Sequence, residues 1–226
     1  MDRLIFPELL KPQITAFFTG KNPGADLSEI SRIFKIKKDN IFMPIQKHTD
    51  KIVMIESSLE PKIADAVITN QKGILIGVQT ADCVPLLLYD SEREVCGAVH
   101  AGWRGTAEGI LKKTLDLMIN RFMSDPKNII IAIGPGIRWC CYAVGQDVLE
   151  SVKGATGEGE YFTSIQGKNC LDLPSANKYQ ALQSGVPEKN IWISEECTFC
   201  NPEKYYSYRY SKGQTGRQGG FIGMLE

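Results

Sequence analysis

The chain contains only two histidines, His48 and His100, and each lies beside an apolar stretch of sequence. Cys83, in the segment TADC, comes directly before another apolar stretch. Zinc binds imidazole nitrogen and thiolate sulfur, and catalytic zinc sites use three protein ligands and leave one coordination position open. His48, Cys83 and His100 would together supply two imidazoles and one thiolate, which is an open set of three ligands.

The sequence leaves the role of these residues open, because nothing local makes them converge. In one alternative, His100 is a hydrogen-bonded residue at the end of a strand and Cys83 is a packed thiol. In another, Cys83 is a nucleophile with His100 as its base, which gives an amide hydrolase or deamidase and leaves His48 without a role. A multicopper oxidase is disfavoured, because such centres need more than two histidines.

Two further segments carry residues suited to an anionic ligand. In AGWRG, small residues flank Trp103 and Arg104, so the backbone can approach a ligand closely. Tryptophan offers a stacking face, and arginine offers a two-pronged donor for phosphate or carboxylate. The segment YYSYRY carries Arg209 among aromatic residues. The alternatives are a surface Trp–Arg pair in a turn for the first segment and an ordinary edge strand for the second.

The chain has seven cysteines, an odd number at irregular spacing, and we interpret them as reduced thiols. Cys140 and Cys141 are adjacent and poorly suited to binding one ion, so we expect them to be packing residues. The segment CTFC, Cys197–Cys200, has the spacing of half a zinc knuckle or a redox pair. No second pair at matching spacing follows it, which favours a structural role. Cys96 is expected in the core.

Composition restricts the class of protein. Lysine and arginine total 26, as do aspartate and glutamate, so the chain has no overall attraction for nucleic acid or anionic membranes. Its apolar runs are shorter than the ~20 residues of a membrane helix. The first residues, MDRLIFPELLKPQ, do not resemble a signal peptide. We therefore expect a cytoplasmic protein that binds neither nucleic acid nor a membrane. We also expect a monomer, although composition does not bear on the oligomeric state.

Short apolar runs bounded by turn residues predict strands over residues 64–69, 74–79, 84–89, 95–100 and 128–133. The connections NQKG and DSER resemble tight hairpins, so much of the sheet should be antiparallel. Late strands are expected in NIWIS, YYSYRY and GFIGML.

Helical periodicity follows Thr106, the expected N-cap, and ends at Asp125-Pro126. A second helix is expected over residues 174–185. Blocks of strands interrupted by a few helices predict an α+β fold. No linker is long enough to separate domains, so we expect residues 1–226 to form a single domain.

Taken together, these motifs resemble a known family. The segments QKHTDKIV, VQTADCVPLLLYD, AVHAGWRGTAEGI, IGPGIRWCCYAVG and CTFCNPEKYYSYRY follow one another as in the YfiH-type proteins, the laccase-domain family. The resemblance extends from about Gln46 to the C-terminus, and TADC…HAGWRG is its most specific part. This family was once described as polyphenol oxidases and is now regarded as purine nucleoside phosphorylases.

The resemblance implies a single-domain α+β fold with a mixed, partly antiparallel β-sandwich-like core flanked by helices. It implies one zinc ion held by His48, Cys83 and His100, with copper as an alternative ion. The implied activities are phosphorolysis of adenosine, inosine and S-methyl-5'-thioadenosine, and hydrolytic deamination of adenosine. Purine nucleosides and phosphate are therefore the expected partners, and some relatives are associated with cell-wall precursor editing. Gly136 departs from the pattern, since relatives usually carry cysteine there.

For this chemistry, Cys83 and His100 are the expected catalytic residues, together with Asp82 as an acid, a base or a support for Cys83. Asp82 can act only if TADC forms a turn, because neighbours in a regular strand point to opposite faces. Arg104 and Arg209 are candidates for phosphate or ribose contacts. Gln46 is a candidate for substrate binding, with a strand-end surface amide as the alternative.

Overall fold

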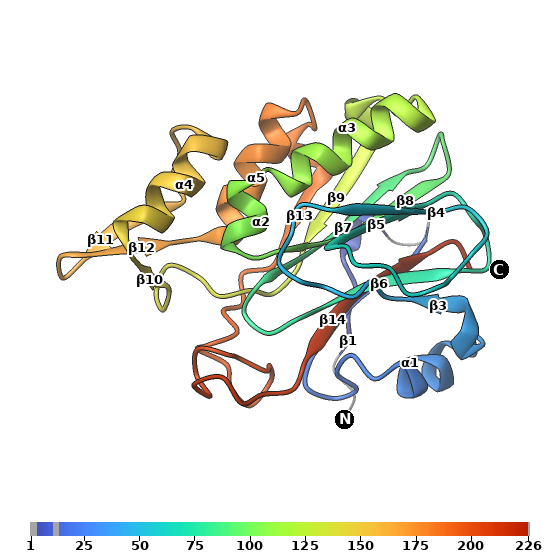
Figure 1. Cartoon of the computed structure of the whole chain (residues 1–226), viewed down its shortest axis with the longest axis horizontal. Coiled ribbons are helices and arrows are strands. Elements are labelled where there is room, and N and C mark those ends of the chain that lie inside the picture. Colours follow the sequence, from blue (N-terminus) through green and yellow to red (C-terminus); the bar gives the residue numbers. More distant parts are fainter. Residues whose placement is uncertain (1–3, 11–13, 226) are drawn as a thin grey trace.

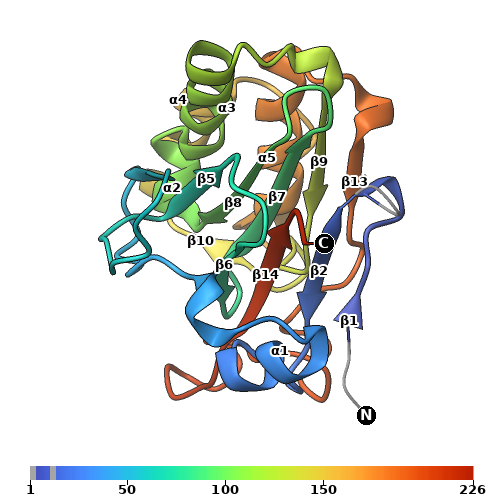
Figure 2. The same ribbon diagram turned by 90° about the vertical axis from the view of Figure 1, so that its right-hand side faces the viewer.

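Two mixed β-sheets packed face to face form the centre of the molecule (Figures 1 and 2). We describe them from a computed structural model, in which residues 4–10 and 14–225 are described. The strands of the six-stranded sheet are, in spatial order, β13 (Ile191–Ile193), β9 (Ile129–Ile133), β7 (Val84–Asp90), β8 (Val95–Ala101), β5 (Ala66–Thr69) and β4 (Ile52–Ile55). The strands of the five-stranded sheet are β1 (Leu4–Ile5), β2 (Thr15–Thr19), β14 (Gln218–Gly223), β6 (Leu75–Thr80) and β3 (Ile41–Phe42). A small third sheet contains β10 (Ala143–Val144), β12 (Lys168–Leu171) and β11 (Phe162–Ile165).

Helices cover both outer faces of this pair of sheets (Figure 1). The six-stranded sheet is covered by α2 (Trp103–Ala107), α3 (Ile110–Phe122) and α5 (Leu173–Gln183). The helix α4 (Gln146–Thr156) packs on α2 and α5, beside the small third sheet. The five-stranded sheet is covered by α1 (Leu27–Phe34). Short 3-10 helices span Glu8–Leu10, Lys38–Asn40, Pro126–Asn128 and Glu188–Asn190. This order of layers confirms the predicted α+β fold with a sandwich-like core.

The strands of the six-stranded sheet are apolar because both of its faces are buried. In β7, Leu86 and Leu88 belong to the apolar cluster under the helices, whereas Leu87 and Tyr89 belong to the cluster between the two sheets. Successive residues of a strand face opposite sides, so a strand covered on both sides has a continuous apolar sequence. The run VPLLLY follows from this arrangement.

The hairpin predicted at DSER is confirmed. β7 and β8 pair antiparallel with Asp90 opposite Val95, and Asp90 Oδ1 accepts hydrogen bonds from the backbone N–H groups of Glu92 and Arg93. The hairpin predicted at NQKG is wrong. β5 already pairs with β4 on one side and with β8 on the other, so the chain leaves that sheet and enters the five-stranded sheet as β6.

The late strands predicted in NIWIS and GFIGML correspond to β13 and β14. The strand predicted in YYSYRY is wrong, because residues 205–210 contain a bend and a turn and no strand. Side chains take up the backbone donors that a strand would use: Gln218 Oε1 accepts from Tyr206 N, and Asp82 Oδ2 accepts from Arg209 N. Such bonds offer the backbone an alternative to a sheet ladder.

Both predicted helices exist, with different starts. Thr106 is buried inside α2 and is not an N-cap, and α3 begins after Gly109, whose φ of 68° breaks the helix. α5 begins at Leu173, where the Asp172 side chain caps Ser175 N at 2.9 Å. Within the described ranges, no helix combines the length and apolar character that a membrane crossing requires.

We expect Leu87→Ala to lower the free energy of unfolding by about 2–5 kcal/mol, because it leaves a cavity between the two sheets. Urea unfolding followed by circular dichroism measures this change. Ile63→Ala is the control, since the Ile63 side chain is 53% exposed and its loss should change stability by about 0.5 kcal/mol or less. Equal effects of the two substitutions would contradict the assignment of Leu87 to the core.

Candidate metal centre

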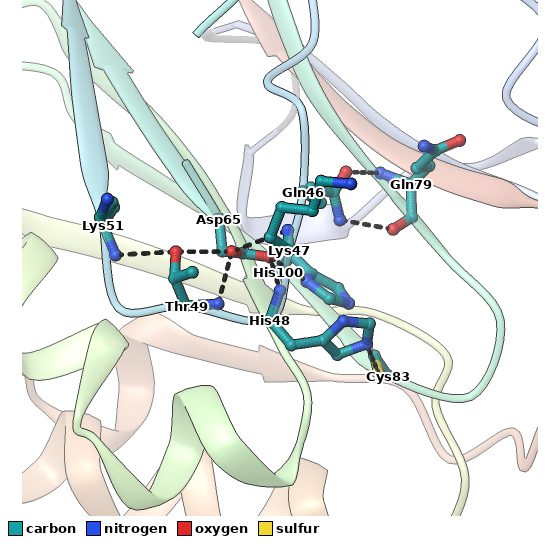
Figure 3. Close-up of polar contacts among 9 residues, drawn as sticks. All are labelled: Gln46, Lys47, His48, Thr49, Lys51, Asp65, Gln79, Cys83 and His100. Carbon is teal, nitrogen blue, oxygen red and sulfur yellow. Dashed lines mark hydrogen bonds and ion pairs between the residues drawn. The ribbon is translucent and has the colours of Figure 1, made fainter. Parts of the chain in front are cut away.

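The structure brings His48, Cys83 and His100 together (Figure 3). His48 lies in the segment between β3 and β4, Cys83 in the three-residue connection from β6 to β7, and His100 in β8. The register pairs the beginning of β7 with the end of β8, with Val84 opposite Ala101, so Cys83 lies close to His100. The three ligand atoms all lie within 4.8 Å of one another, and Cys83 Sγ is 3.8 Å from His48 Nε2.

Asp65, directly before β5, organises two of these residues, and sequence reasoning missed it. Its fully buried carboxylate accepts hydrogen bonds from three consecutive backbone N–H groups, those of Lys47, His48 and Thr49, at 3.2, 3.0 and 2.6 Å (Figure 3). The Thr49 hydroxyl donates a further bond at 2.8 Å. Such a concave run of N–H groups binds an anion, and here it holds the His48 backbone at a left-handed φ of 57°.

The same carboxylate orients His100. His100 Nδ1 lies 2.8 Å from Asp65 Oδ1, and both side chains are buried. With Nδ1 donating to Asp65, Nε2 is the atom available to a metal ion or to Cys83. Metal-binding histidines usually carry such a partner on their other nitrogen, which fixes ring orientation and raises ligand basicity.

Cys83, His100 and Asp65 stabilise one another in their charged forms. Burial disfavours the Cys83 thiolate, but the charge of His100 and hydrogen bonds from both imidazoles outweigh it and lower the pKa of Cys83 to about 6. Burial also disfavours protonated His100, but the Cys83 thiolate and Asp65 outweigh it and raise the pKa of His100 to about 9. Burial opposes ionisation of Asp65 as well, yet hydrogen bonds from His100 and Thr49 hold its pKa well below the usual range.

Gly102 allows Cys83 and His48 to approach the backbone of the β8–α2 junction. A Cβ atom at this position would lie 2.9 Å from Cys83 Sγ and 3.3 Å from His48 Cδ2. The first distance is too short for a carbon–sulfur contact. The glycine in HAGWRG therefore serves close packing against the ligand atoms.

The three side chains fit a metal ion. A tetrahedral ion with ordinary zinc bond lengths places nitrogen and sulfur donors about 3.3–3.6 Å apart. The observed 3.8 Å between Cys83 Sγ and His48 Nε2 is close to this value. The set is thus compatible with one metal ion and leaves one coordination position for another molecule.

A cavity of about 500 Å³ opens beside the three ligands. Two of its walls carry arginine side chains that rest on aromatic rings. The Cζ atom of Arg104 lies 4.4 Å from the centroid of the Trp103 ring, and the Cζ atom of Arg209 lies 5.0 Å from the centroid of the Tyr142 ring. The structure thus brings the predicted Arg104 and Arg209 to one cavity.

Asp82 and Gln46 also line this cavity, but their polar atoms are engaged by protein groups. Asp82 has a φ of 84°, so TADC is a turn, as its predicted role requires. Its carboxylate accepts bonds from Thr198 Oγ1 at 2.6 Å and Arg209 N at 2.7 Å. Gln46 exchanges two hydrogen bonds of 2.8 Å with the Gln79 backbone. The predicted roles of both residues in catalysis or substrate binding stay predictions.

Trp103, which the sequence offered as a stacking face for a ligand, also lines the cavity. Ile137, Tyr142 and Tyr208 line it as well and were not predicted to lie there. These three residues come from loops whose relative positions have no local sequence signal. For Asp65 there was a signal, because a carboxylate at the start of the apolar run ADAVIT needs buried partners.

The cysteines follow the predictions only in part. Cys96 is fully buried between the two sheets, as expected. Cys140 is exposed, so its assignment as a packing residue is wrong, and Cys141 is half-buried. The sulfur atoms of both lie with those of Cys197 and Cys200 in one group, because two loops distant in sequence meet there.

We expect Asp65→Asn to weaken zinc binding by about 10–100-fold, because it removes the charge that orients His100 and the His48 backbone. Competition with a chromophoric chelator measures the affinity. Asp50→Asn is the matched control, because Asp50 forms an exposed ion pair with Lys113 instead. Unchanged zinc affinity in Asp65→Asn would refute this supporting role.

We expect Gly102→Ala to displace Cys83 and weaken zinc binding, while the backbone, at a φ of −76°, accepts alanine without strain. The same chelator competition, with thermal unfolding alongside, checks this. Gly154→Ala, in α4 with open space around it, should keep zinc affinity and raise stability by about 0.5–1 kcal/mol. Wild-type zinc affinity in Gly102→Ala would contradict the close approach.

Comparison with known proteins gives one family. The model of the family described as "Multi-copper polyphenol oxidoreductase laccase" matches residues 24–225. A "Purine nucleoside phosphorylase" of Deinococcus radiodurans is 42% identical over 160 residues, which cover 71% of this chain and 61% of that protein. The chain thus spans less than two thirds of this relative's length. An "Adenosine deaminase RL5" from an unknown prokaryotic organism is 34% identical over 79% of this chain and 73% of its own.

The fold is also found among solved structures. The hypothetical protein YfiH of Bacillus licheniformis superposes with a TM-score of 0.87 at 30% sequence identity, covering 95% of this chain and 93% of that one. The match of the family model over residues 24–225 includes the ligand segments and both arginine-bearing walls of the cavity. The chain therefore belongs to the YfiH-type laccase-domain family, whose model is described as a multi-copper polyphenol oxidoreductase laccase.

Proposed function

We propose that this protein is a zinc-dependent purine nucleoside phosphorylase that acts on adenosine, inosine and S-methyl-5'-thioadenosine and also deaminates adenosine. The observation that carries the proposal is the convergence of His48, Cys83 and His100 on a cavity of nucleoside size. The names of similar proteins, a purine nucleoside phosphorylase and an adenosine deaminase, support the choice of substrate class.

His48 Nε2, Cys83 Sγ and His100 Nε2 would hold the zinc ion. When bound, zinc supplies Lewis-acid polarisation to the molecule that occupies its open coordination position. Asp65 keeps His100 in the required tautomer, and its bond to His48 N keeps the loop in place.

The two arginine side chains are suited to phosphate. Arg104 and Arg209 are exposed to the cavity, and the guanidinium group binds phosphate through two parallel N–H donors. Arg209 is restrained, because its backbone N–H donates to Asp82 and its guanidinium donates to Ala143 O at 3.3 Å. Asp82 would then act as a positioning residue that sets the phosphate donor beside Cys83.

The aromatic groups of the cavity suit the nucleoside. Trp103 and Tyr142 present ring faces that can stack on a purine, and each already stacks on an arginine. Phosphorolysis forms a bond from a phosphate oxygen to the ribose C1' and breaks the bond from C1' to the purine nitrogen. The cavity therefore has to hold phosphate and nucleoside together, with phosphate at the arginines.

A second candidate function, a metal-free amide hydrolase or deamidase, is favoured by one specific observation. Asp65, His100 and Cys83 form a chain of contacts that resembles a cysteine–histidine–carboxylate nucleophile, as a metal-free amide hydrolase or deamidase requires. That reading gives no role to His48, although its imidazole lies 3.8 Å from the thiol. Zinc binding uses all three side chains and is the better account of their arrangement.

The His48→Asn variant separates the two readings. Asparagine tolerates the left-handed backbone of this position but removes the imidazole ligand. We expect the zinc-loaded wild type to release adenine from adenosine only when phosphate is present and to form inosine in its absence. In His48→Asn both products should fall to background, as measured by liquid chromatography with zinc quantitation. Asp50→Asn should retain wild-type turnover.

Undiminished turnover in metal-free His48→Asn would overturn the zinc mechanism in favour of the cysteine nucleophile. Inactivity of the zinc-loaded wild type toward all three nucleosides would overturn the proposed reaction.

A further inference from the structure

A second group of metal-binding side chains lies outside the His48 site. Cys140 and Cys141 belong to the loop between β9 and β10, and Cys197 and Cys200 belong to the loop after β13. The four sulfur atoms all lie within 4.8 Å of one another. None of the four cysteines takes part in the function proposed above.

Backbone contacts fix these two loops together. Gly136 and Cys197 form an isolated parallel bridge, and Thr198 N donates to Gly136 O at 3.1 Å. In the other loop, both Cys141 N and Tyr142 N donate to Arg138 O at 3.0 Å, which forms a tight turn. The turn presents the adjacent cysteines toward one partner, although neighbours in an extended chain would point apart.

The sulfur positions match one metal ion. Cys200 Sγ lies 3.6 Å from Cys140 Sγ and 3.2 Å from Cys141 Sγ. A tetrahedral zinc ion with four sulfur ligands places the sulfurs about 3.8 Å apart. A disulfide bond holds its two sulfur atoms about 2.05 Å apart, and all four thiols are free. The observed spacing is therefore close to that of a tetrathiolate site.

Packing in the apolar core does not explain why these four cysteines lie together. Free cysteines usually pack as small apolar residues, yet Cys140 and Cys200 are exposed. Two thiols at the surface gain little from the apolar core. The exposed side of the group also gives an ion access from solvent, which a metal site needs.

We propose that Cys140, Cys141, Cys197 and Cys200 bind one Zn²⁺ ion. Four thiolates leave no open coordination position, so this site is structural and differs from the three-ligand site at His48. The ion ties the loop that carries Tyr142 to the loop that carries Thr198, whose hydroxyl holds Asp82 at 2.6 Å. The site therefore braces two walls of the cavity, and it exists whatever reaction the cavity supports.

The test counts zinc in the full-length chain. Reduced protein is stripped with a chelator, loaded with Zn²⁺ and desalted, and its zinc content is measured by mass spectrometry. We expect the double variant Cys140→Ser/Cys200→Ser to retain about one equivalent less than the wild type. Both substituted side chains are exposed, and Cys170→Ala, outside the group, is the control that keeps the wild-type content.

The ligands are identified in His48→Asn, which lacks the first site. Its remaining zinc should show an X-ray absorption shell of sulfur alone at about 2.3 Å. If the double variant does not fold, the wild type gives the answer through alkylation. There, Zn²⁺ should slow modification of the four cysteines but leave Cys170 unaffected.

Equal zinc content in the wild type and the folded double variant would overturn the proposal. A disulfide within the group in protein that binds no second zinc would replace it with a redox pair. Iron with acid-labile sulfide in the purified chain would replace it with an iron–sulfur cluster.

Discussion

The buried carboxylate of Asp65 is the interaction on which the candidate site depends. Burying a charge is costly unless hydrogen bonds satisfy it, and Asp65 receives bonds from the segment 47–49 and from His100. These partners come from two separate elements, the segment before β4 and the strand β8. One side chain thereby fixes the loop of His48 and the tautomer of His100. The register between β7 and β8 is then sufficient to bring Cys83 close to the two histidines.

The sandwich provides that register. The chain passes from the five-stranded to the six-stranded sheet in only three residues, 81–83, so this connection has to turn sharply between the end of β6 and the start of β7. The turn gives Asp82 and Cys83 different neighbours: Asp82 meets Thr198 and Arg209, and Cys83 meets the histidines. Loops held by a rigid core commonly carry binding groups in this way.

The His48–Cys83–His100 group and the four-cysteine group differ in their number of metal-binding atoms, and this difference indicates different roles. The family description names several copper ions and an oxidoreductase, but the chain has only two histidines, and both belong to one group. That group has three donors beside a cavity, which suits chemistry at an open position. The four-cysteine group has one donor more and lies between two loops, which suits a structural ion. Neither arrangement provides the several imidazoles of a multicopper centre.

The sequence by itself determined the α+β class, most strands of the six-stranded sheet and the hairpin at DSER, because strand burial and turn chemistry are local. That hairpin pairs Val84 with Ala101, which brings the neighbouring Cys83 close to His100. His48 joined the candidate ligand set as one of only two histidines in the chain, and the likeness to a known family implied the same three residues. Only the tertiary structure decided that Asp65 links the histidines and that Cys140 and Cys141 meet Cys197 and Cys200. It also decided that β6 joins the other sheet. These outcomes depend on contacts between segments far apart in the chain, and such contacts follow from how the two sheets pack.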